Sequence, residues 1–167
     1  MTLLIRFATI LAMIALVLAS CSSSDTPATS QLGQAPGFAL EGMDGKTIDF
    51  EQYKGKLVLV DFWATWCPPC RRSIPHLAEL HTKYSGRGFE VVGISLDNTG
   101  KESVASFARD YSIPYTILMG TQETAMKWNI GSGIPVAILV NREGAVVEKI
   151  VGYKDTQFWE QKIAQYL

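Results

Sequence analysis

The chain has 167 residues, of which 47% are hydrophobic, and its 15 basic and 16 acidic residues leave a net charge of -1. This length allows one domain with a hydrophobic core, and the composition is that of an ordinary globular protein. The near-neutral charge, with no long basic run carrying interleaved aromatic residues, argues against a nucleic-acid-binding protein.

The first twenty residues have the pattern of an export signal. They carry one charge, at Arg6, followed by the apolar run 7–19, which is short for a membrane span but suits a signal peptide. The run ends in Leu-Ala-Ser-Cys at 18–21, which resembles the bacterial lipobox. We therefore expect residues 1–20 to be removed and Cys21 to carry a lipid that anchors an extracytoplasmic domain on the periplasmic side. An uncleaved N-terminal helix, or an ordinary signal with an incidental cysteine, would also export the domain.

Residues 21–35 are rich in Ser, Thr, Pro and Gln and predict a flexible tether, so we place the folded domain at 36–167. Apolar periodicity and turn signals predict the elements of this domain. In chain order they are a hairpin (38–42 and 46–50), a buried central strand (57–63), a helix (70–84), a strand (89–96), a helix (101–111), a short strand (114–118), a short helix (121–128), a hairpin (135–140 and 145–151) and a final helix (156–167). This alternation predicts an α/β fold, with a mixed sheet flanked by helices. A right-handed crossover would bring the start of the 70–84 helix to the carboxyl end of the central strand.

Cys67 and Cys70 lie at this junction of strand and helix and are separated by Pro68 and Pro69. With Cys21 as the anchor they are the only other cysteines, and so short a loop stabilises little as a structural disulfide. The free amides and positive end of a helix favour a thiolate at Cys67, and a second cysteine three residues on can resolve a mixed disulfide. The pair therefore predicts a working dithiol, with Cys67 as the exposed nucleophile and Cys70 as the buried resolving thiol.

Half of a zinc site is the competing interpretation of a C-x-x-C motif. Zinc needs two further ligands, and the only histidines, His76 and His81, lie on the same predicted helix as the cysteines. One helix cannot wrap four such ligands around an ion. We expect no metal and no cofactor besides the Cys67–Cys70 disulfide, and we place the histidines on the helix surface.

Several further features accompany the cysteines: Val-Asp-Phe-Trp-Ala at 60–64 before Trp66, Pro75 in the following helix, Gly-Ile-Pro at 133–135, and Gly152. Together they resemble the thioredoxin superfamily over residues 36–167. The N-terminal hairpin and a helix-bearing insertion at about 98–114, of the TlpA/AhpC type, are similar to the TlpA/ResA-like thiol-disulfide oxidoreductases within it. The resemblance implies a thioredoxin-like fold and a protein disulfide oxidoreductase.

The resemblance also assigns roles to residues around the cysteines. It implies a cis peptide bond before Pro135, which would aim the Ile134 backbone at Cys67 so that an extended substrate strand can pair there. Trp66, with Pro68 and Pro69, would line the substrate rim, and Trp63 would pack beneath the site. A trans proline that merely begins a strand is the plainer alternative for Pro135.

Asp61 is the anomaly of the central strand, because a carboxylate in a buried strand must be paired or protonated. Its pKa is therefore expected to rise. By resemblance Asp61 is the proton acceptor for Cys70; a strand-end aspartate that reaches water is the alternative. Two positions depart from the family patterns. Gly93 stands where thioredoxins carry a lysine, and Ser73 stands where TlpA/ResA-like proteins often carry a glutamate.

The direction of electron flow depends on opposing features. The two prolines remove amide donors from the helix start and favour a reducing couple, whereas Arg71 and Arg72 would favour a thiolate unless they are simply solvated. We expect a monomeric reductase of disulfides in exported proteins such as apocytochrome c, kept reduced by a membrane electron donor of the DsbD/CcdA type. An oxidant or isomerase of exported proteins remains the alternative.

Two other classes share this fold but not this pattern. A peroxiredoxin would place a proline and a threonine ahead of a lone cysteine as P-x-x-x-T-x-x-C, whereas here Thr65 is two residues before Cys67 and no such proline precedes it. A copper chaperone on this fold would need a C-x-x-x-C motif and a distant histidine, and this chain has neither. The sequence therefore favours disulfide exchange over either alternative.

Overall fold

The computed structural model describes residues 32–167. The expected signal peptide, the expected anchor Cys21 and most of the expected tether lie outside the described residues. No helix of the described part is long and apolar enough to cross a membrane. The elements are β1 (Ala39–Glu41), β2 (Thr47–Asp49), the 3-10 helix η1 (Phe50–Tyr53), β3 (Leu57–Trp63), α2 (Pro68–Tyr84), the 3-10 helix η2 (Ser85–Arg87), β4 (Phe89–Ser95), α3 (Lys101–Asp110), β5 (Thr116–Met119), α4 (Gln122–Lys127), β6 (Val136–Val140), β7 (Val146–Val151) and α5 (Thr156–Tyr166).

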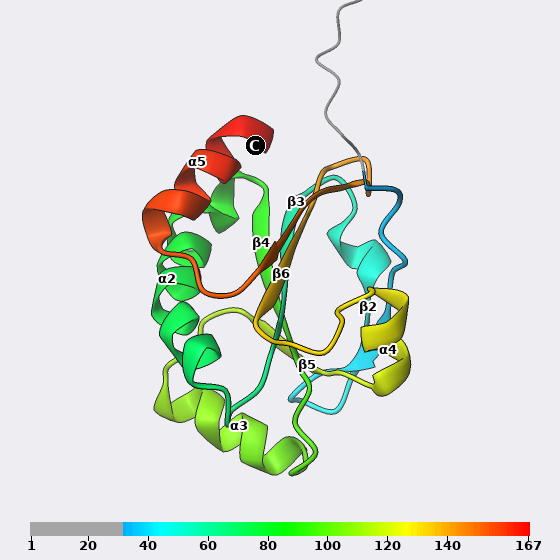
Figure 1. Ribbon diagram of the computed structural model, residues 1–167, viewed down its shortest axis with the longest axis vertical. Helices are drawn as coiled ribbons and strands as arrows, with labels where there is room; N and C mark the ends of the chain where they lie inside the picture. Colours follow the sequence, from blue (N-terminus) through cyan, green and yellow to red (C-terminus); the bar gives the residue numbers. More distant parts are fainter. Residues whose placement is uncertain (1–31) are drawn as a thin grey trace, which may run out of the picture.

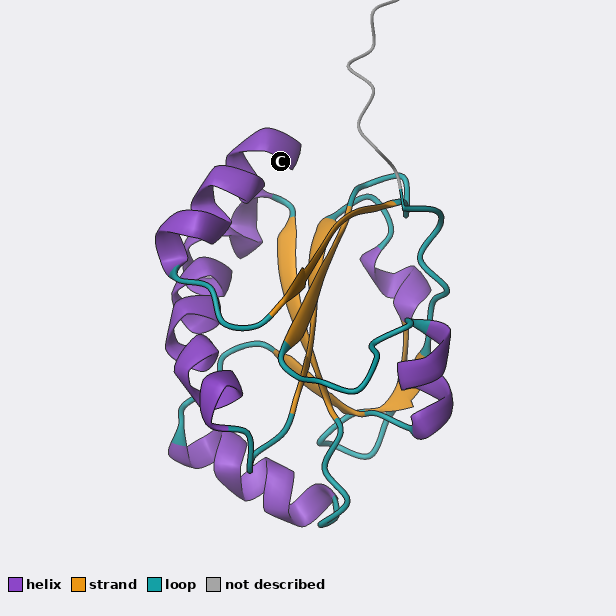
Figure 2. Ribbon diagram, viewed as in Figure 1, coloured by secondary structure: helices purple, strands orange, loops and turns teal. Residues whose placement is uncertain are grey.

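The centre of the fold is a five-stranded mixed sheet in the order β5-β4-β3-β6-β7. Strands β3, β4 and β5 are parallel, while β6 runs antiparallel to β3 and β7 antiparallel to β6. Helices α2, α3 and α5 cover one face, and β1, β2, η1 and α4 lie over the other (Figures 1 and 2). The predicted thioredoxin-like fold, including the N-terminal hairpin, is confirmed.

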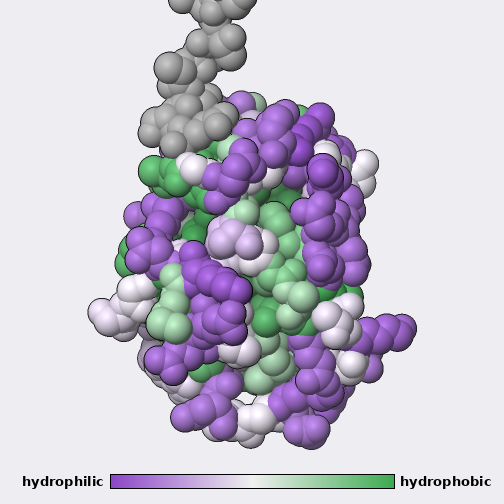
Figure 3. Space-filling view, turned by 90° about the vertical axis from the view of Figure 1, so that its right-hand side faces the viewer, coloured by the Kyte–Doolittle hydropathy of each residue, from purple (hydrophilic) through white to green (hydrophobic). Residues whose placement is uncertain are grey.

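Strand β3 is buried at every residue because both faces of the sheet are covered. Side chains alternate between the faces of a strand, so Leu57, Leu59 and Trp63 pack under α2 and α5, whereas Val58 and Phe62 pack under α4 and the hairpin. Burial on both faces explains why β3 is an almost continuous apolar run. On the side of the molecule where α4 lies, hydrophobic residues are visible at the surface and are flanked by hydrophilic residues (Figure 3).

Helix α2 begins at Pro68, two residues earlier than predicted. Its first two positions are prolines, which fit there because the first amides of a helix have no partner within it. The helix continues through Pro75 to Tyr84. The short strand expected at 114–118 is found as β5, which begins two residues later, and the ends of the other predicted elements differ from the observed ones by at most one residue.

The folded domain begins before Pro36, which corrects the expected boundary. The Leu32 amide donates to the Val146 carbonyl at 2.9 Å, and the Ala35 amide donates to the Gly144 carbonyl at 2.9 Å. Residues 32–35 therefore pair with the start of β7 rather than belonging to a tether. Their composition gives no apolar pattern because the pairing uses backbone groups alone.

Candidate active site

Cys67 and Cys70 form a disulfide at the carboxyl end of β3 and the start of α2. The sulfurs are bonded at 2.08 Å, and the Cα atoms are 5.3 Å apart. Cys67 is the residue that caps α2, and its Sγ accepts a hydrogen bond from the Cys70 amide at 3.3 Å. The pair therefore lies where the strand-helix crossover predicts it.

Cys67 is not exposed in this disulfide form, contrary to the sequence-based expectation. Only 3% of its surface is accessible, and Cys70 is fully buried. The Cys67 sulfur is bonded to the buried Cys70 sulfur, and it lies 3.7 Å from the carbonyl oxygen of Ile134. The burial of Cys70 agrees with the prediction.

The loop that contacts Cys67 contains a cis peptide bond between Ile134 and Pro135, as the resemblance implies. The two tryptophans near the disulfide differ in burial. Trp63 is buried in the same hydrophobic cluster as both cysteines, whereas Trp66 is 60% exposed. An exposed aromatic ring next to the disulfide is available to an incoming polypeptide.

Asp61 is buried beneath the site, with 2% of its surface accessible. It shares a strand face with Leu59 and Trp63, which pack in the cluster that holds the cysteines. Its Oδ2 atom has no hydrogen-bond partner among the described residues. Burial raises the pKa of Asp61 to about 7. The alternative of a strand-end aspartate that reaches water does not hold.

The neighbouring strand leaves little room for a side chain beside Asp61. Gly93 pairs directly with Asp61 in the β3–β4 register. A Cβ atom at Gly93 would lie 3.0 Å from Trp63 Nε1 and 3.2 Å from the ring of Tyr115. Tyr115 was not anticipated from the sequence. Burial and the negative charge of Asp61 raise the pKa of the Tyr115 hydroxyl, which therefore stays neutral. The Tyr115 ring closes this side of the site.

A second carboxylate that sequence reasoning missed holds the turn before the cysteines. Asp97 accepts hydrogen bonds from the Thr65 amide at 2.9 Å and from the Thr65 hydroxyl at 2.5 Å. It also accepts from the Ser95 hydroxyl at 2.8 Å. Its place just after a buried parallel strand was the available signal, because such strands end at the same sheet edge as the cysteines.

The histidines are half-buried rather than solvated. His76 contacts Thr156 Oγ1 through Nδ1 at 2.8 Å and the Tyr153 hydroxyl through Nε2 at 2.9 Å. His81 Nδ1 lies 3.8 Å from a carboxylate oxygen of Glu90. Both therefore pack against neighbouring elements. Within residues 32–167, no three His, Cys, Asp or Glu side chains are arranged to hold a metal ion.

Comparison with known proteins now identifies the family. The model of the AhpC/TSA family matches residues 33–149 of this chain. The chain belongs to this family. A relative of this chain, the thiol-disulfide oxidoreductase ResA of Bacillus cereus, is 36% identical over 125 residues, which cover 73% of this chain and 70% of the relative. The ResA protein of Bacillus subtilis is 32% identical, over 74% of this chain and 68% of its own length.

A solved structure extends the likeness to three dimensions. The thiol:disulfide interchange protein of Chlorobium tepidum, a thioredoxin family protein, is 31% identical with a TM-score of 0.74, covering 80% of this chain and 95% of that one. This member of the AhpC/TSA family is therefore a thiol-disulfide oxidoreductase with the pair Cys67 and Cys70. The expected resemblance to ResA-like oxidoreductases is confirmed.

Proposed function

We propose that the protein is a membrane-anchored extracytoplasmic reductase of disulfides in exported proteins. The Cys67 thiolate attacks one sulfur of the substrate disulfide, forming a mixed disulfide and releasing the first substrate thiolate. The Cys70 thiolate then attacks Cys67 Sγ, which releases the second substrate thiolate and closes the Cys67–Cys70 disulfide. Two electrons pass to the substrate, and the proton lost by each attacking thiol balances the proton gained by each released thiolate.

The single observation that carries the reducing direction is the cap of α2. Cys67 Sγ accepts from the Cys70 amide, but Pro69, at the position whose amide would be a second donor, has none. Hydrogen bonds to a thiolate stabilise the reduced form of the couple. A site with one such donor holds its thiolate less strongly than a site with two, and this favours giving electrons away.

Asp61 is proposed to take the proton from Cys70. The carboxyl group is buried on the face of β3 that packs against the cysteines, and its pKa of about 7 lets it exchange a proton near neutral pH. Resolution of the mixed disulfide requires Cys70 as a thiolate, and Cys70 has no access to water in the disulfide form. A buried acceptor would meet that need.

The substrate is proposed to bind as an extended strand across Ile134 and Pro135, with contacts to Trp66 and to the prolines Pro68 and Pro69. The carbonyl of Ile134 lies beside Cys67 Sγ, and Trp66 presents an exposed ring on the same rim. Backbone pairing gives affinity with little dependence on sequence. Such binding suits an enzyme that acts on several exported proteins, with apocytochrome c as one of them.

The anchor and the electron donor complete the proposal. The lipobox-like sequence ending at Cys21 supports lipidation, and a membrane donor of the DsbD/CcdA type would return the pair to the dithiol form. Labelling of cells with an alkyne fatty acid should mark the wild-type chain and not Cys21→Ser. Labelling of both, or of neither, would contradict the lipid anchor.

The reductase function is tested by mixing the reduced chain with a disulfide-bonded Cys-x-x-Cys-His peptide of an apocytochrome c. We expect free peptide thiols to appear as the Cys67–Cys70 disulfide forms. Cys70→Ser should stop at a mixed disulfide that mass spectrometry detects on Cys67, and Cys67→Ser should not react. If the oxidised chain instead transfers its disulfide to reduced peptides while the reduced chain fails to act, the alternative of an oxidant or isomerase is correct.

A further inference from the structure

Two arginines follow Cys70 on the outward side of α2, and each lies over an aromatic ring of a different element. The Arg71 guanidinium is 5.4 Å from the centroid of Tyr111, just after α3, and its Nε donates to the Tyr111 hydroxyl at 2.9 Å. The Arg72 guanidinium is 5.3 Å from the centroid of Tyr153, in the loop between β7 and α5. Both arginines and both tyrosines are exposed.

Neither guanidinium has an acidic partner within the part of the chain that the structure describes. The ion pairs there use lysines and His81, not Arg71 or Arg72. Two other carboxylates already accept hydrogen bonds from backbone amides. Asp97 is buried and accepts from the Thr65 amide, and Asp155 caps α5 by accepting from the Phe158 amide. The first turns of α2 therefore present two unneutralised positive charges within two residues of the reactive disulfide.

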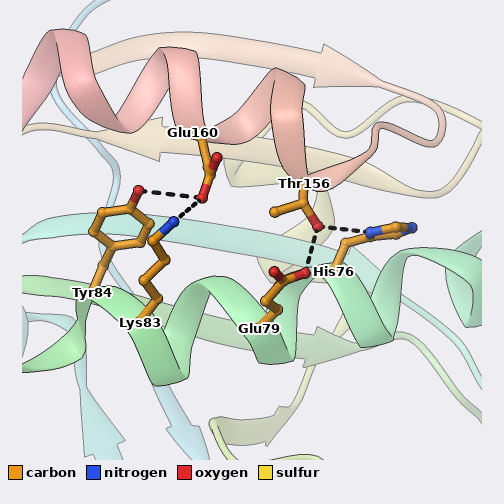
Figure 4. Close-up of polar contacts among 6 residues, drawn as sticks. All are labelled: His76, Glu79, Lys83, Tyr84, Thr156 and Glu160. Carbon is orange, nitrogen blue, oxygen red and sulfur yellow. Dashed lines mark hydrogen bonds and ion pairs between the residues drawn. The ribbon is translucent and has the colours of Figure 1, made fainter.

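The ring under Arg72 is held by a chain of hydrogen bonds that runs into α2. The Thr156 hydroxyl donates to Glu79 Oε2 at 2.9 Å, so its oxygen accepts from His76 Nδ1 (Figure 4). The other ring nitrogen of His76, Nε2, lies within hydrogen-bond distance of the Tyr153 hydroxyl, at 2.9 Å. The loop that carries Tyr153 is also tied to the cis-proline loop, because the Gly152 amide donates to the Pro135 carbonyl at 2.8 Å.

A fixed guanidinium loses less conformational entropy on binding a carboxylate than a free one, and its planar fork suits a carboxylate well. Trp66, the residue before Cys67, adds an exposed aromatic side chain. Resting on the proposed reductase function, we infer that Arg71 and Arg72 form a cationic rim that selects substrates with acidic residues flanking the disulfide cysteines. The partner is thus an acidic stretch of a disulfide-bonded polypeptide, bound next to the cysteine that Cys67 attacks.

The test uses the reduced full chain in a non-ionic detergent and three peptides with one disulfide each. The peptides are identical except that the residues flanking the cysteines are Asp, Asn or Lys. Exchange rates are followed by tryptophan fluorescence. We expect the Asp peptide to react about three- to tenfold faster than the Asn peptide, and the Lys peptide to react slowest. The differences between the three exchange rates should shrink in about 0.5 M salt, because exposed charges are strongly screened there.

The readout is the ratio of the Asp rate to the Lys rate, because a general change in Cys67 reactivity cancels in it. The double variant, which combines Arg71→Ala and Arg72→Ala, should bring this ratio close to one. Tyr153→Leu, which keeps both charges but removes a ring, should lower it partly. Arg87→Ala is the matched control, since Arg87 also lies over a tyrosine, at 5.2 Å from the Tyr84 centroid, but at the far end of α2. It should leave the ratio unchanged.

A wild-type chain that reduces all three peptides equally would overturn the cationic rim and leave the reductase function standing. A double variant that keeps the wild-type ratio would overturn it as well. A chain that reduces none of the peptides would overturn the reductase function, and the inference that rests on it.

Discussion

The sulfur of Cys67 accepts a hydrogen bond from the backbone amide of Cys70 at 3.3 Å, across two residues that have no amide hydrogen. This contact joins the two members of the redox pair at the cap of α2. A capping side chain ordinarily accepts from the second or third amide of its helix, and here the second position is Pro69. The reducing character proposed for the pair depends on this missing donor.

Replacing Pro69 with alanine should therefore make the couple more oxidising. The new amide would give the Cys67 thiolate a second donor, and a charge-assisted hydrogen bond should raise the reduction potential by about 30 mV. Pro68→Ala is the matched control, because the first amide of a helix does not reach the capping side chain. Equilibration with glutathione measures both variants. An equal shift in the two, or none in Pro69→Ala, would contradict the role of the cap.

Removing the Asp61 carboxyl group should slow the resolution of the mixed disulfide. A general base is worth about 10²- to 10⁴-fold, so Asp61→Asn should slow attack by Cys70 by about 100-fold or more at pH 8. The wild-type rate should rise with pH as Asp61 ionises through its pKa of about 7, and the variant should lose that rise. The rate of Cys70 attack is measured by single-turnover experiments in which the mixed disulfide is quenched at successive times. The pH range of about 5.5 to 8.5 brackets the pKa of about 7. An unchanged pH profile in Asp61→Asn would rule out the proton acceptor.

The same carboxyl group should make folding stability depend on pH. Burial raises its pKa from 3.8 to about 7, so the folded state binds the proton more tightly than the unfolded state. The free energy of unfolding should then be highest below pH 3.8, fall as the pH rises to about 7, and stay level above it. Asp61→Asn removes this dependence and should gain on the order of 4 kcal/mol at pH 8.

Urea unfolding of the disulfide form at several pH values checks this prediction. The difference between Asp61→Asn and wild type should be small at pH 4 and large at pH 8, which lie on either side of the titration expected at about 7. A difference that stays constant over this range would mean that Asp61 is already ionised and solvated in the folded protein.

A methyl group added beside Asp61 should destabilise the fold. In Gly93→Ala the new Cβ would lie 3.0 Å from Trp63 Nε1 and 3.2 Å from the Tyr115 ring, in a packed interior. Such overpacking should lower the free energy of unfolding by about 1–3 kcal/mol. Gly86→Ala is the control, since nothing lies within 4 Å of its Cβ position. Equal stability of Gly93→Ala and wild type would show that Tyr115 yields readily.

Much of this architecture follows from local pattern. Strand β3 was predicted with its observed ends because burial on both faces demands a continuous apolar run, and Asp61 stood out within that run. The cysteine pair was placed correctly because the crossover from β3 to α2 is short and has one favoured hand. These features depend on residues close together in the chain.

The parts that were missed depend on contacts between distant segments. Tyr115 faces Asp61 only because β5 and β3 both border β4, and no local pattern marks that meeting. The pairing of residues 32–35 with β7 uses backbone groups, which are the same in any sequence. The burial of Cys67 depends on the Ile134 loop, which lies 67 residues along the chain.

The reduction potential of the Cys67–Cys70 couple tests the central claim most directly. It can be followed by tryptophan fluorescence in dithiothreitol or glutathione buffers, because Trp63 packs in the cluster that holds the disulfide. The account predicts a value near that of thioredoxin, about -270 mV, as expected of a dedicated reductase. A value near that of DsbA, about -120 mV, would contradict it and make the protein an oxidant of exported proteins.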